Sequence, residues 1–322
     1  MAPADPRGRR APRRLTSAAL SALLLATLTG CWSSGAEQPS EPSSSSGTEP
    51  STSDGPQTPA FTSYAALGDS YTAAPFVPVT DLAEGCLRSN GNYPALLADA
   101  LGIAEVRDVS CSAAETRDVE VPQRVAGGQG TVPPQLRAVR RGTDLVTLGI
   151  GGNDEDLFAT LVGCVGGFGP AAPGAAPPST GPCLGDVADP TAAIGRVGER
   201  VALALDAVTA AAPRATVVLV GYPRLVGEAG GCRQFPIDPS DVPAAQELEK
   251  ALRDALAGAA RRAGVTFLDT YTLSAGHEIC ADDPWVNGRR TDESRALAFH
   301  PFAEGQQAVA DALAARLGQE AS

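Results

Sequence analysis

Basic residues are scarce in this sequence, and lysine is almost missing from it. The chain has 25 lysines and arginines against 37 aspartates and glutamates, with a formal net charge of −12, and Lys250 is the only lysine. A nucleic-acid binding surface needs clustered positive charge, and electrostatic docking onto anionic lipid also needs positive charge. The composition therefore argues against both kinds of partner.

Histidine is almost as rare, which narrows the candidates for acid–base chemistry. His277 and His300 are the only two histidines, so a general base of the imidazole type must be one of them. The chain has seven cysteines but no C-x-x-C pair, which together with so few histidines argues against zinc. We therefore expect no metal and no cofactor.

Apart from Cys31, the cysteines form an even set. They are Cys86, Cys111, Cys164, Cys183, Cys232 and Cys280. An even number in an oxidising compartment predicts three disulfides. Cys164 and Cys183 bracket a segment rich in glycine and proline at residues 163–188, which we interpret as a disulfide-closed surface loop.

The apolar stretch near the N-terminus is too short to span a bilayer as a mature helix. It covers residues 15–30 and follows a segment that holds five arginines. Its end, LTGC at residues 28–31, resembles the lipobox of bacterial lipoproteins, whose cysteine is lipidated and becomes the mature N-terminus. We expect a lipoprotein signal peptide over residues 1–30 and a lipid anchor on Cys31. An ordinary secretory signal followed by a chance cysteine is the alternative.

The segment that follows has almost no apolar side chain after Trp32. Residues 31–60 are mainly serine, proline, glycine, threonine and acidic residues. Such a composition cannot bury enough surface to offset its ordering entropy, so we expect a disordered tether. The sequence thus predicts an exported protein held by its lipid at the outer face of the cell membrane.

Residues 61–322 alternate between strand-like and helix-like patterns. Strands are predicted at 64–68, 104–110, 144–150, 215–221 and 265–271, with helices between Pro190 and Pro213, between Asp241 and Gly264, and after Pro301. This alternation predicts one α/β domain, with a parallel sheet of about five strands and helices on both faces. Ligands of such sheets bind at the carboxyl ends of the strands.

Three polar residues stand at positions where chemistry is expected. Ser70 follows the strand-like YAALGD, Asn153 lies in the glycine-rich GIGGND after the third strand, and His300 precedes the last helix. Two of them also have a structural interpretation: Ser70 as a helix N-cap and Asn153 as a partner of local backbone. The glycine-rich turn lacks the spacing of a P-loop or a dinucleotide fingerprint.

In this order, the three motifs resemble those of the GDSL/SGNH hydrolases. The resemblance covers residues 61–322 and is closest to the actinobacterial secreted esterases and lipases with a Ser-His dyad, including GYPRL and GHEIC. It implies a single flavodoxin-like domain in which Ser70 attacks an ester and His300 acts as general base. The Ser70 N–H and the Asn153 side chain would stabilise the oxyanion. A G-x-S-x-G elbow is absent, which argues against an α/β-hydrolase.

The sequence departs from the family pattern at two positions. The glycine that supplies an oxyanion-hole N–H is replaced by Ala113, which keeps its N–H. Leu297 stands where many members have an aspartate, and Asp292 and Glu293 lie too far upstream. The resemblance instead implies that the Leu297 carbonyl orients His300. It also implies the disulfides Cys86–Cys111, Cys164–Cys183 and Cys232–Cys280.

The remaining candidate residues are not expected to take part directly in the reaction. His277 is expected to be structural, Trp285 either lines an acyl pocket or is structural, and Asp69 and Asp154 are expected to orient loops. The function predicted is that of an exported, monomeric serine esterase or lipase acting on a lipid or small acyl ester. The alternatives are a carbohydrate O-deacetylase or phospholipase on the same fold, and a non-catalytic ligand-binding lipoprotein.

Overall fold

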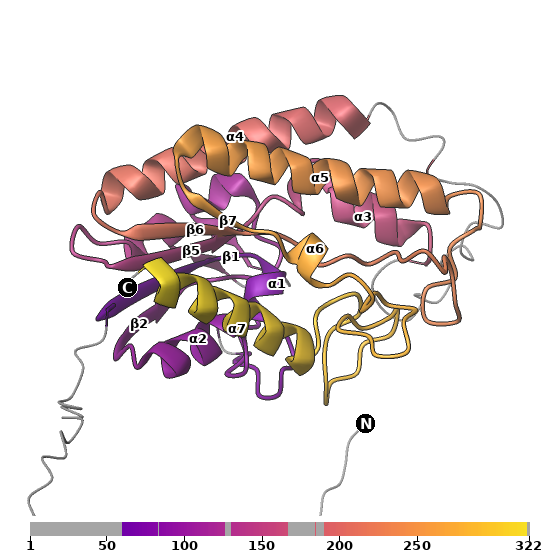
Figure 1. The fold of residues 1–322 in the computed structure, drawn as a ribbon, viewed down its shortest axis with the longest axis horizontal. Helices are drawn as coiled ribbons and strands as arrows, with labels where there is room; N and C mark the ends of the chain where they lie inside the picture. The colour runs from indigo at the N-terminus through magenta and orange to yellow at the C-terminus, as the bar shows by residue number, and fades with distance from the viewer. Residues whose placement is uncertain (1–59, 83, 126–129, 167–183, 185–189, 321–322) are drawn as a thin grey trace, which may run out of the picture. The chain divides into compact units, whose positions relative to one another are not determined.

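The structure is a computed structural model that describes residues 60–82, 84–125, 130–166, 184 and 190–320 (Figure 1). The described residues all belong to one compact unit, residues 56–322. The expected signal peptide, Cys31, nearly all of the tether and Cys183 lie outside the described residues.

A five-stranded parallel sheet forms the centre of this unit, as predicted. Its strand order is β2-β1-β5-β6-β7. The strands are β1 (Ser63–Gly68), β2 (Glu105–Asp108), β5 (Leu145–Gly149), β6 (Thr216–Val220) and β7 (Thr266–Leu268). Every residue of β1 and β5 is buried, which explains their nearly continuous apolar sequences. A short antiparallel pair, β3 (Gln123–Arg124) and β4 (Thr131–Val132), lies outside the sheet.

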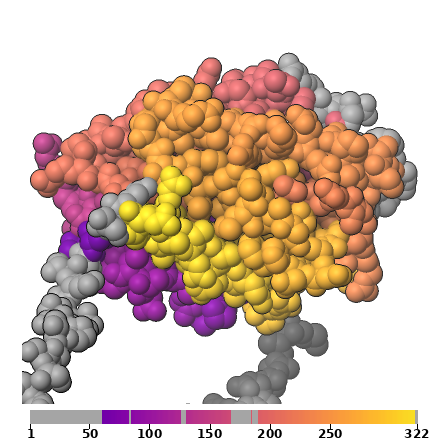
Figure 2. All heavy atoms as spheres, in the orientation of Figure 1, coloured from indigo at the N-terminus to yellow at the C-terminus, as the bar shows by residue number. Residues whose placement is uncertain are grey.

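Long helices cover both faces of the sheet (Figure 1). One face is covered by α4 (Pro190–Ala211) and α5 (Val242–Ala263), and the other by α2 (Tyr93–Leu101) and α7 (Ala303–Glu320). Their boundaries follow ordinary helix signals: α5 begins after Asp241 and ends at Gly264, whose φ of 69° is readily adopted by glycine. Figure 2 shows that residues from the C-terminal half of the chain cover most of the face in view.

The apolar spacing of the two longest helices predicts the faces that they bury. In α4 the predicted residues Ile194, Val197, Val201, Leu205 and Val208 are all buried. In α5, Leu252 and Leu256 are buried and Leu248 is half-buried. Burying one such side chain stabilises the fold by about 1.5–3 kcal/mol relative to leaving it exposed. On the solvent side of α5, the exposed Lys250 forms an ion pair with Asp254 at 2.7 Å.

Several short helices lie in the loops that connect the strands and the long helices. They are α1 (Ser70–Ala73), α3 (Leu157–Gly163), α6 (Thr270–Leu273) and the 3₁₀ segments η1 (Thr116–Val119), η2 (Gln135–Ala138) and η3 (Asp154–Asp156). The prediction of a strand to residue 271 is wrong at its end, because the Asp269 side chain accepts a hydrogen bond from Thr272 N at 3.1 Å and caps α6 there.

The sheet order places two loops side by side. The chain runs outward from β1 to β2 and then returns past β1 to β5, so the direction of winding switches between β1 and β5. Gly68 pairs with Gly149 across these strands, and Asp69 N donates to Gly149 O at 3.0 Å. The loops that carry Ser70 and Asn153 therefore leave adjacent strands at the edge where α/β sheets bind ligands.

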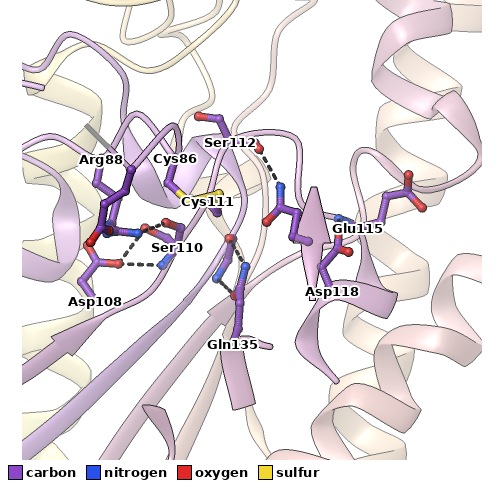
Figure 3. Close-up of a disulfide and its surroundings, with 12 residues drawn as sticks. Cys86, Arg88, Asp108, Ser110, Cys111, Ser112, Glu115, Asp118 and Gln135 are labelled. Atoms are coloured by element: carbon purple, nitrogen blue, oxygen red, sulfur yellow. Dashed lines mark hydrogen bonds and ion pairs between the residues drawn. A yellow bond between two sulfur atoms is a disulfide. The ribbon is translucent and has the colours of Figure 1, made fainter. Parts of the chain in front are cut away.

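Two of the three expected disulfides join described cysteines. Cys86–Cys111 and Cys232–Cys280 are both formed (Figure 3 shows the first). The third predicted pairing involves Cys183, which is outside the described residues.

Within the described ranges, no helix combines the length and the apolar character that a membrane crossing requires.

Candidate active site

Ser70 lies in a turn that packs tightly against its neighbours. The side-chain amide of Gln135, which Figure 3 labels, forms hydrogen bonds with both Gly68 N (2.8 Å) and Gly68 O (2.9 Å). A Cβ on Gly68 would lie 2.2 Å from Thr72 Oγ1 and 2.7 Å from Gly149 O, so only glycine fits. Asp69, rather than Ser70, is the N-cap of α1 and accepts from Tyr71 N at 2.9 Å. The hydroxyl of Ser70 is therefore not used in capping.

The two ends of the domain meet at Ser70 and His300. The distance between Ser70 Oγ and His300 Nε2 is 2.7 Å, and both side chains are buried. On the other side of the ring, Nδ1 lies 2.7 Å from the carbonyl oxygen of Ala298. A carbonyl can only accept, so Nδ1 carries the proton and Nε2 accepts the Ser70 hydroxyl.

The expectation that the Leu297 carbonyl orients His300 is wrong by one residue. Leu297 O instead accepts from His300 N and from Asn287 Nδ2, both at 3.2 Å. Phe299 has a φ of 60°, a left-handed conformation that is unusual for a bulky residue. This conformation accompanies the contact between the His300 ring and the carbonyl of Ala298. The carboxylate of Asp292 is exposed and accepts from Ser294.

Burial keeps the His300 ring neutral. It lowers the pKa of His300 to about 4, and the hydrogen bond with Ala298 opposes this shift only in part. The ring also packs against Tyr71, with 5.0 Å between the ring centroids. At neutral pH the site therefore holds a neutral imidazole whose free lone pair points at a serine hydroxyl.

Three groups that can donate hydrogen bonds belong to the segments around Ser70. Ala113 has a φ of 62°, which is the conformation that glycine would adopt there. Among the described residues, neither Ala113 N nor Ser70 N has a hydrogen-bond acceptor. Asn153 donates to Ala114 O at 2.9 Å through one hydrogen of its amide, which leaves the other available.

The segment of Ala113 is fixed on both sides. Cys111 N donates to Gly68 O at 2.9 Å, next to the Cys86–Cys111 disulfide (Figure 3). Asp154 accepts from Thr116 N at 2.9 Å and from Thr116 Oγ1 at 2.5 Å. This agrees with the loop-orienting role expected of Asp154, because the bonds join the Ala113 turn to the Asn153 loop.

Tyr222, which sequence reasoning did not select, joins the nucleophile turn to the Asn153 loop. Its hydroxyl donates to Asp69 Oδ2 at 2.5 Å and accepts from Gly152 N at 2.8 Å. Burial raises the pKa of Asp69 to about 7, while the bonds from Tyr222 and Tyr71 N oppose the shift. Tyr222 lies in the GYPRL motif, but nothing in that motif identifies partners so distant in the sequence.

His277 and Trp285 lie together, beside a largely apolar pocket. Their rings stack with centroids 3.8 Å apart, and His277 Nδ1 lies 2.8 Å from the carbonyl oxygen of Asp283. Trp285 lines this pocket together with Tyr71, Tyr222 and Pro301, among others. In the part of the chain that the structure describes, no group of three or more His, Cys, Asp or Glu side chains is placed to hold a metal ion.

Tyr222→Phe tests the shared hydroxyl directly. Because it leaves the buried Oδ2 of Asp69 without its donor, the free energy of unfolding should fall by about 1–3 kcal/mol. The amide of Gly152 should also exchange faster with solvent, since it loses its acceptor. Denaturant unfolding and hydrogen exchange measure the two effects. Tyr71→Phe, which removes a hydroxyl bonded to Phe299 O at 2.7 Å, is the matched control and should leave Gly152 exchange unchanged. Unaltered Gly152 exchange in Tyr222→Phe would contradict this bridge.

Comparison with known proteins identifies the family. Residues 66–308 match the model of the GDSL-like lipase/acylhydrolase family. Lipase 2 of Streptomyces coelicolor is 35% identical over 257 residues, covering 77% of this chain and 83% of the relative. The extracellular lipase of Streptomyces rimosus aligns with a TM-score of 0.64 and 30% identity, over 79% of this chain and 99% of that one. Phospholipase A1 of Streptomyces albidoflavus aligns with a TM-score of 0.65 and 29% identity, over 80% and 99%. The chain therefore belongs to the GDSL-like lipase/acylhydrolase family of carboxylic ester hydrolases.

Proposed function

We propose that this protein is an exported esterase or lipase that works through an acyl-enzyme on Ser70, with His300 as general base. The observation that carries the proposal is the pair of contacts on the His300 ring, 2.7 Å to Ser70 Oγ and 2.7 Å to Ala298 O. Together they give the tautomer that a general base requires.

In the first half of the reaction, Ser70 Oγ attacks the ester carbonyl while its proton passes to His300 Nε2. The oxyanion of the tetrahedral intermediate takes hydrogen bonds from Ser70 N, Ala113 N and Asn153 Nδ2, and each such donor is typically worth on the order of 10²- to 10³-fold in turnover. His300 then returns the proton to the leaving alcohol, and the acyl-enzyme remains. In the second half, water attacks in place of Ser70 and His300 repeats the cycle.

The oxyanion also makes His300 a stronger base at the moment it is needed. Burial disfavours the imidazolium in the free enzyme, and a carbonyl offers it a dipole rather than a full charge. A negative charge that develops within a few ångströms favours the protonated ring. Proton transfer and oxyanion formation therefore support each other.

The substrates proposed are lipid or small acyl esters. Relatives at 31–35% identity carry the names lipase and esterase. A carbohydrate O-deacetylase on the same fold is the alternative that hydrolysis of acetylated glycans would reveal.

Replacing the nucleophile tests the proposal. Ser70→Ala should lower turnover of a 4-nitrophenyl ester by about 10⁴-fold or more, because the covalent step is lost. A fluorophosphonate probe should label the wild type at Ser70, as peptide mass spectrometry would show. His277→Ala and Asp292→Asn are controls that should keep more than about a tenth of wild-type turnover. If folded His277→Ala lost activity and His300→Ala kept it, the assignment of the base would be wrong.

The pH profile should report the low pKa of His300. Since the neutral ring is the base and its pKa is about 4, kcat/KM should hold down to about pH 5 and fall tenfold per pH unit below pH 4. An unshifted histidine would instead give an acid limb near pH 6.5. A second inflection near pH 7 would come from Asp69 and should vanish in Asp69→Asn. An acid limb near 6.5 that persisted in Asp69→Asn would contradict the buried base.

We further propose that the protein is lipid-anchored through Cys31. The support is the LTGC sequence after an export-type segment, and the two disulfides are typical of proteins that fold in an oxidising compartment. Cys31→Ser should release the protein from the membrane fraction and leave its esterase activity unchanged. Mass spectrometry of the native protein that found an unmodified N-terminus elsewhere would count against the anchor.

A further inference from the structure

Tyr71, which directly follows the proposed nucleophile, contacts the segment of the proposed base through both its ring and its hydroxyl. The ring packs against the ring of His300, with 5.0 Å between the centroids and 32° between the planes. The hydroxyl donates to the carbonyl oxygen of Phe299 at 2.7 Å. Burial raises the pKa of Tyr71 well above its ordinary value, so the hydroxyl keeps its proton and remains a donor throughout the pH range in which His300 titrates.

Tyr71 is itself held in place by its neighbours. Its N donates to Asp69 Oδ1 at 2.9 Å, and its carbonyl oxygen accepts from Gln306 Nε2 at 2.9 Å. Gln306, on α7, is buried and accepts in turn from Tyr93 N at 2.7 Å. The ring of Tyr71 stacks on that of Phe158, with 5.2 Å between the centroids. The hydroxyl therefore extends from a side chain whose position is set by packing and by hydrogen bonds, as precise positioning of another group requires.

The carbonyl that Tyr71 holds belongs to the residue with the unusual backbone conformation. Phe299 has a φ of 60°, and a bulky residue keeps such a conformation only where its surroundings impose it. Phe299 N donates to Gly288 O at 3.0 Å, and the buried Phe299 ring meets that of Phe235 edge-to-face, with centroids 6.1 Å apart. The hydroxyl of Tyr71 adds a contact from the opposite partner of the dyad, because it comes from the helix that begins at Ser70.

The conformation of Phe299 determines whether the His300 ring reaches Ala298. Nδ1 lies 2.7 Å from the carbonyl oxygen of Ala298, two residues earlier in the chain. The peptide that joins Phe299 to His300 lies between these groups, and the Tyr71 hydroxyl fixes its direction by holding its oxygen. Without this donor, a buried carbonyl would lose its partner, which is costly. Rotation of the peptide toward another donor would then carry Nδ1 away from Ala298.

We propose that Tyr71 is a positioning residue for His300, whose hydroxyl holds the Phe299 peptide in the conformation that keeps the ring in its Nδ1–H tautomer and aims Nε2 at Ser70. The inference rests on the proposed roles of Ser70 and His300. Because Tyr71 directly follows Ser70 in the chain, its side chain also ties the base to the turn that carries the nucleophile.

The kinetic test uses Tyr71→Phe, which removes the hydroxyl and keeps the ring. For a 4-nitrophenyl ester, kcat should fall about 10- to 100-fold, since a displacement of about 1 Å can cost this much. KM should change less than about twofold, because the lost interaction acts on the reaction and not on binding. With 4-aminophenylalanine at position 71, whose amine also donates, most of kcat should return.

The matched control is Tyr64→Phe. It removes a buried hydroxyl that lies 2.6 Å from Thr147 Oγ1, near the start of β1 and away from His300. Denaturant unfolding should show that Tyr64→Phe destabilises the fold, while kcat stays unchanged.

Nitrogen NMR of the histidine rings tests the position of His300 without any substrate. The chain has only two histidines, so protein labelled with nitrogen-15 histidine gives two sets of ring signals. Wild-type His300 should be the Nδ1–H tautomer with a slowly exchanging proton. In Tyr71→Phe that proton should exchange faster, and the Nε2–H tautomer should appear. His277, whose Nδ1 lies 2.8 Å from Asp283 O, should be unchanged in the same spectra.

The two measurements separate this inference from the proposed function. If folded Tyr71→Phe kept the wild-type His300 signals, the positioning role would be overturned, whether or not kcat fell. An equal loss of kcat in Tyr64→Phe would overturn it as well. A wild type that hydrolysed no ester, with the change of tautomer in Tyr71→Phe still observed, would overturn the proposed function and support the positioning of His300 by Tyr71.

Discussion

The carboxyl group of Asp69 is wholly buried, and two parts of the site are positioned through it. Its oxygens accept hydrogen bonds from Tyr71 N and the Tyr222 hydroxyl, and the same hydroxyl holds Gly152 N. Burying a carboxyl group costs free energy unless hydrogen-bond donors surround it. Losing either donor would therefore destabilise the whole arrangement around Asp69. The turn of Ser70 and the loop of Asn153 are thereby fixed relative to each other, although they belong to different strands.

The group that orients the His300 ring is not one that can stabilise the charge of the protonated ring. A peptide carbonyl sets the tautomer and direction of the ring, but it brings no full charge to the imidazolium. In a triad, a carboxylate performs both tasks. In the mechanism that we propose, the oxyanion itself stabilises the imidazolium, so the segments that carry Ala113 and Asn153 would matter for proton transfer as well as for the carbonyl. This dependence gives a reason for the dense hydrogen bonding around Thr116 and Asp154.

Much of this arrangement could be predicted from local sequence. Buried strands and capped helices have regular patterns, so the sheet and the bounds of α4 and α5 followed from apolar spacing, proline and glycine. The rule for strand ends placed the loops of Ser70 and Asn153 at one edge, and the resemblance to the family implied that His300 meets Ser70. The carbonyl of Ala298 could not, because it depends on a left-handed phenylalanine that propensity disfavours. The role of Tyr222 depends on contacts between segments far apart in the chain, which no local pattern encodes.

Because the chain has a single lysine, the position of that lysine determines where amine-reactive reagents can attach. Lys250 lies on the solvent side of α5, which covers one face of the sheet. Apart from the amino terminus, it carries the only primary amine of the chain. Once the amino terminus is blocked, amine-reactive chemistry would therefore attach a dye or a solid support at one defined place. Every immobilised molecule would then have the same orientation, a property that most proteins acquire only by engineering.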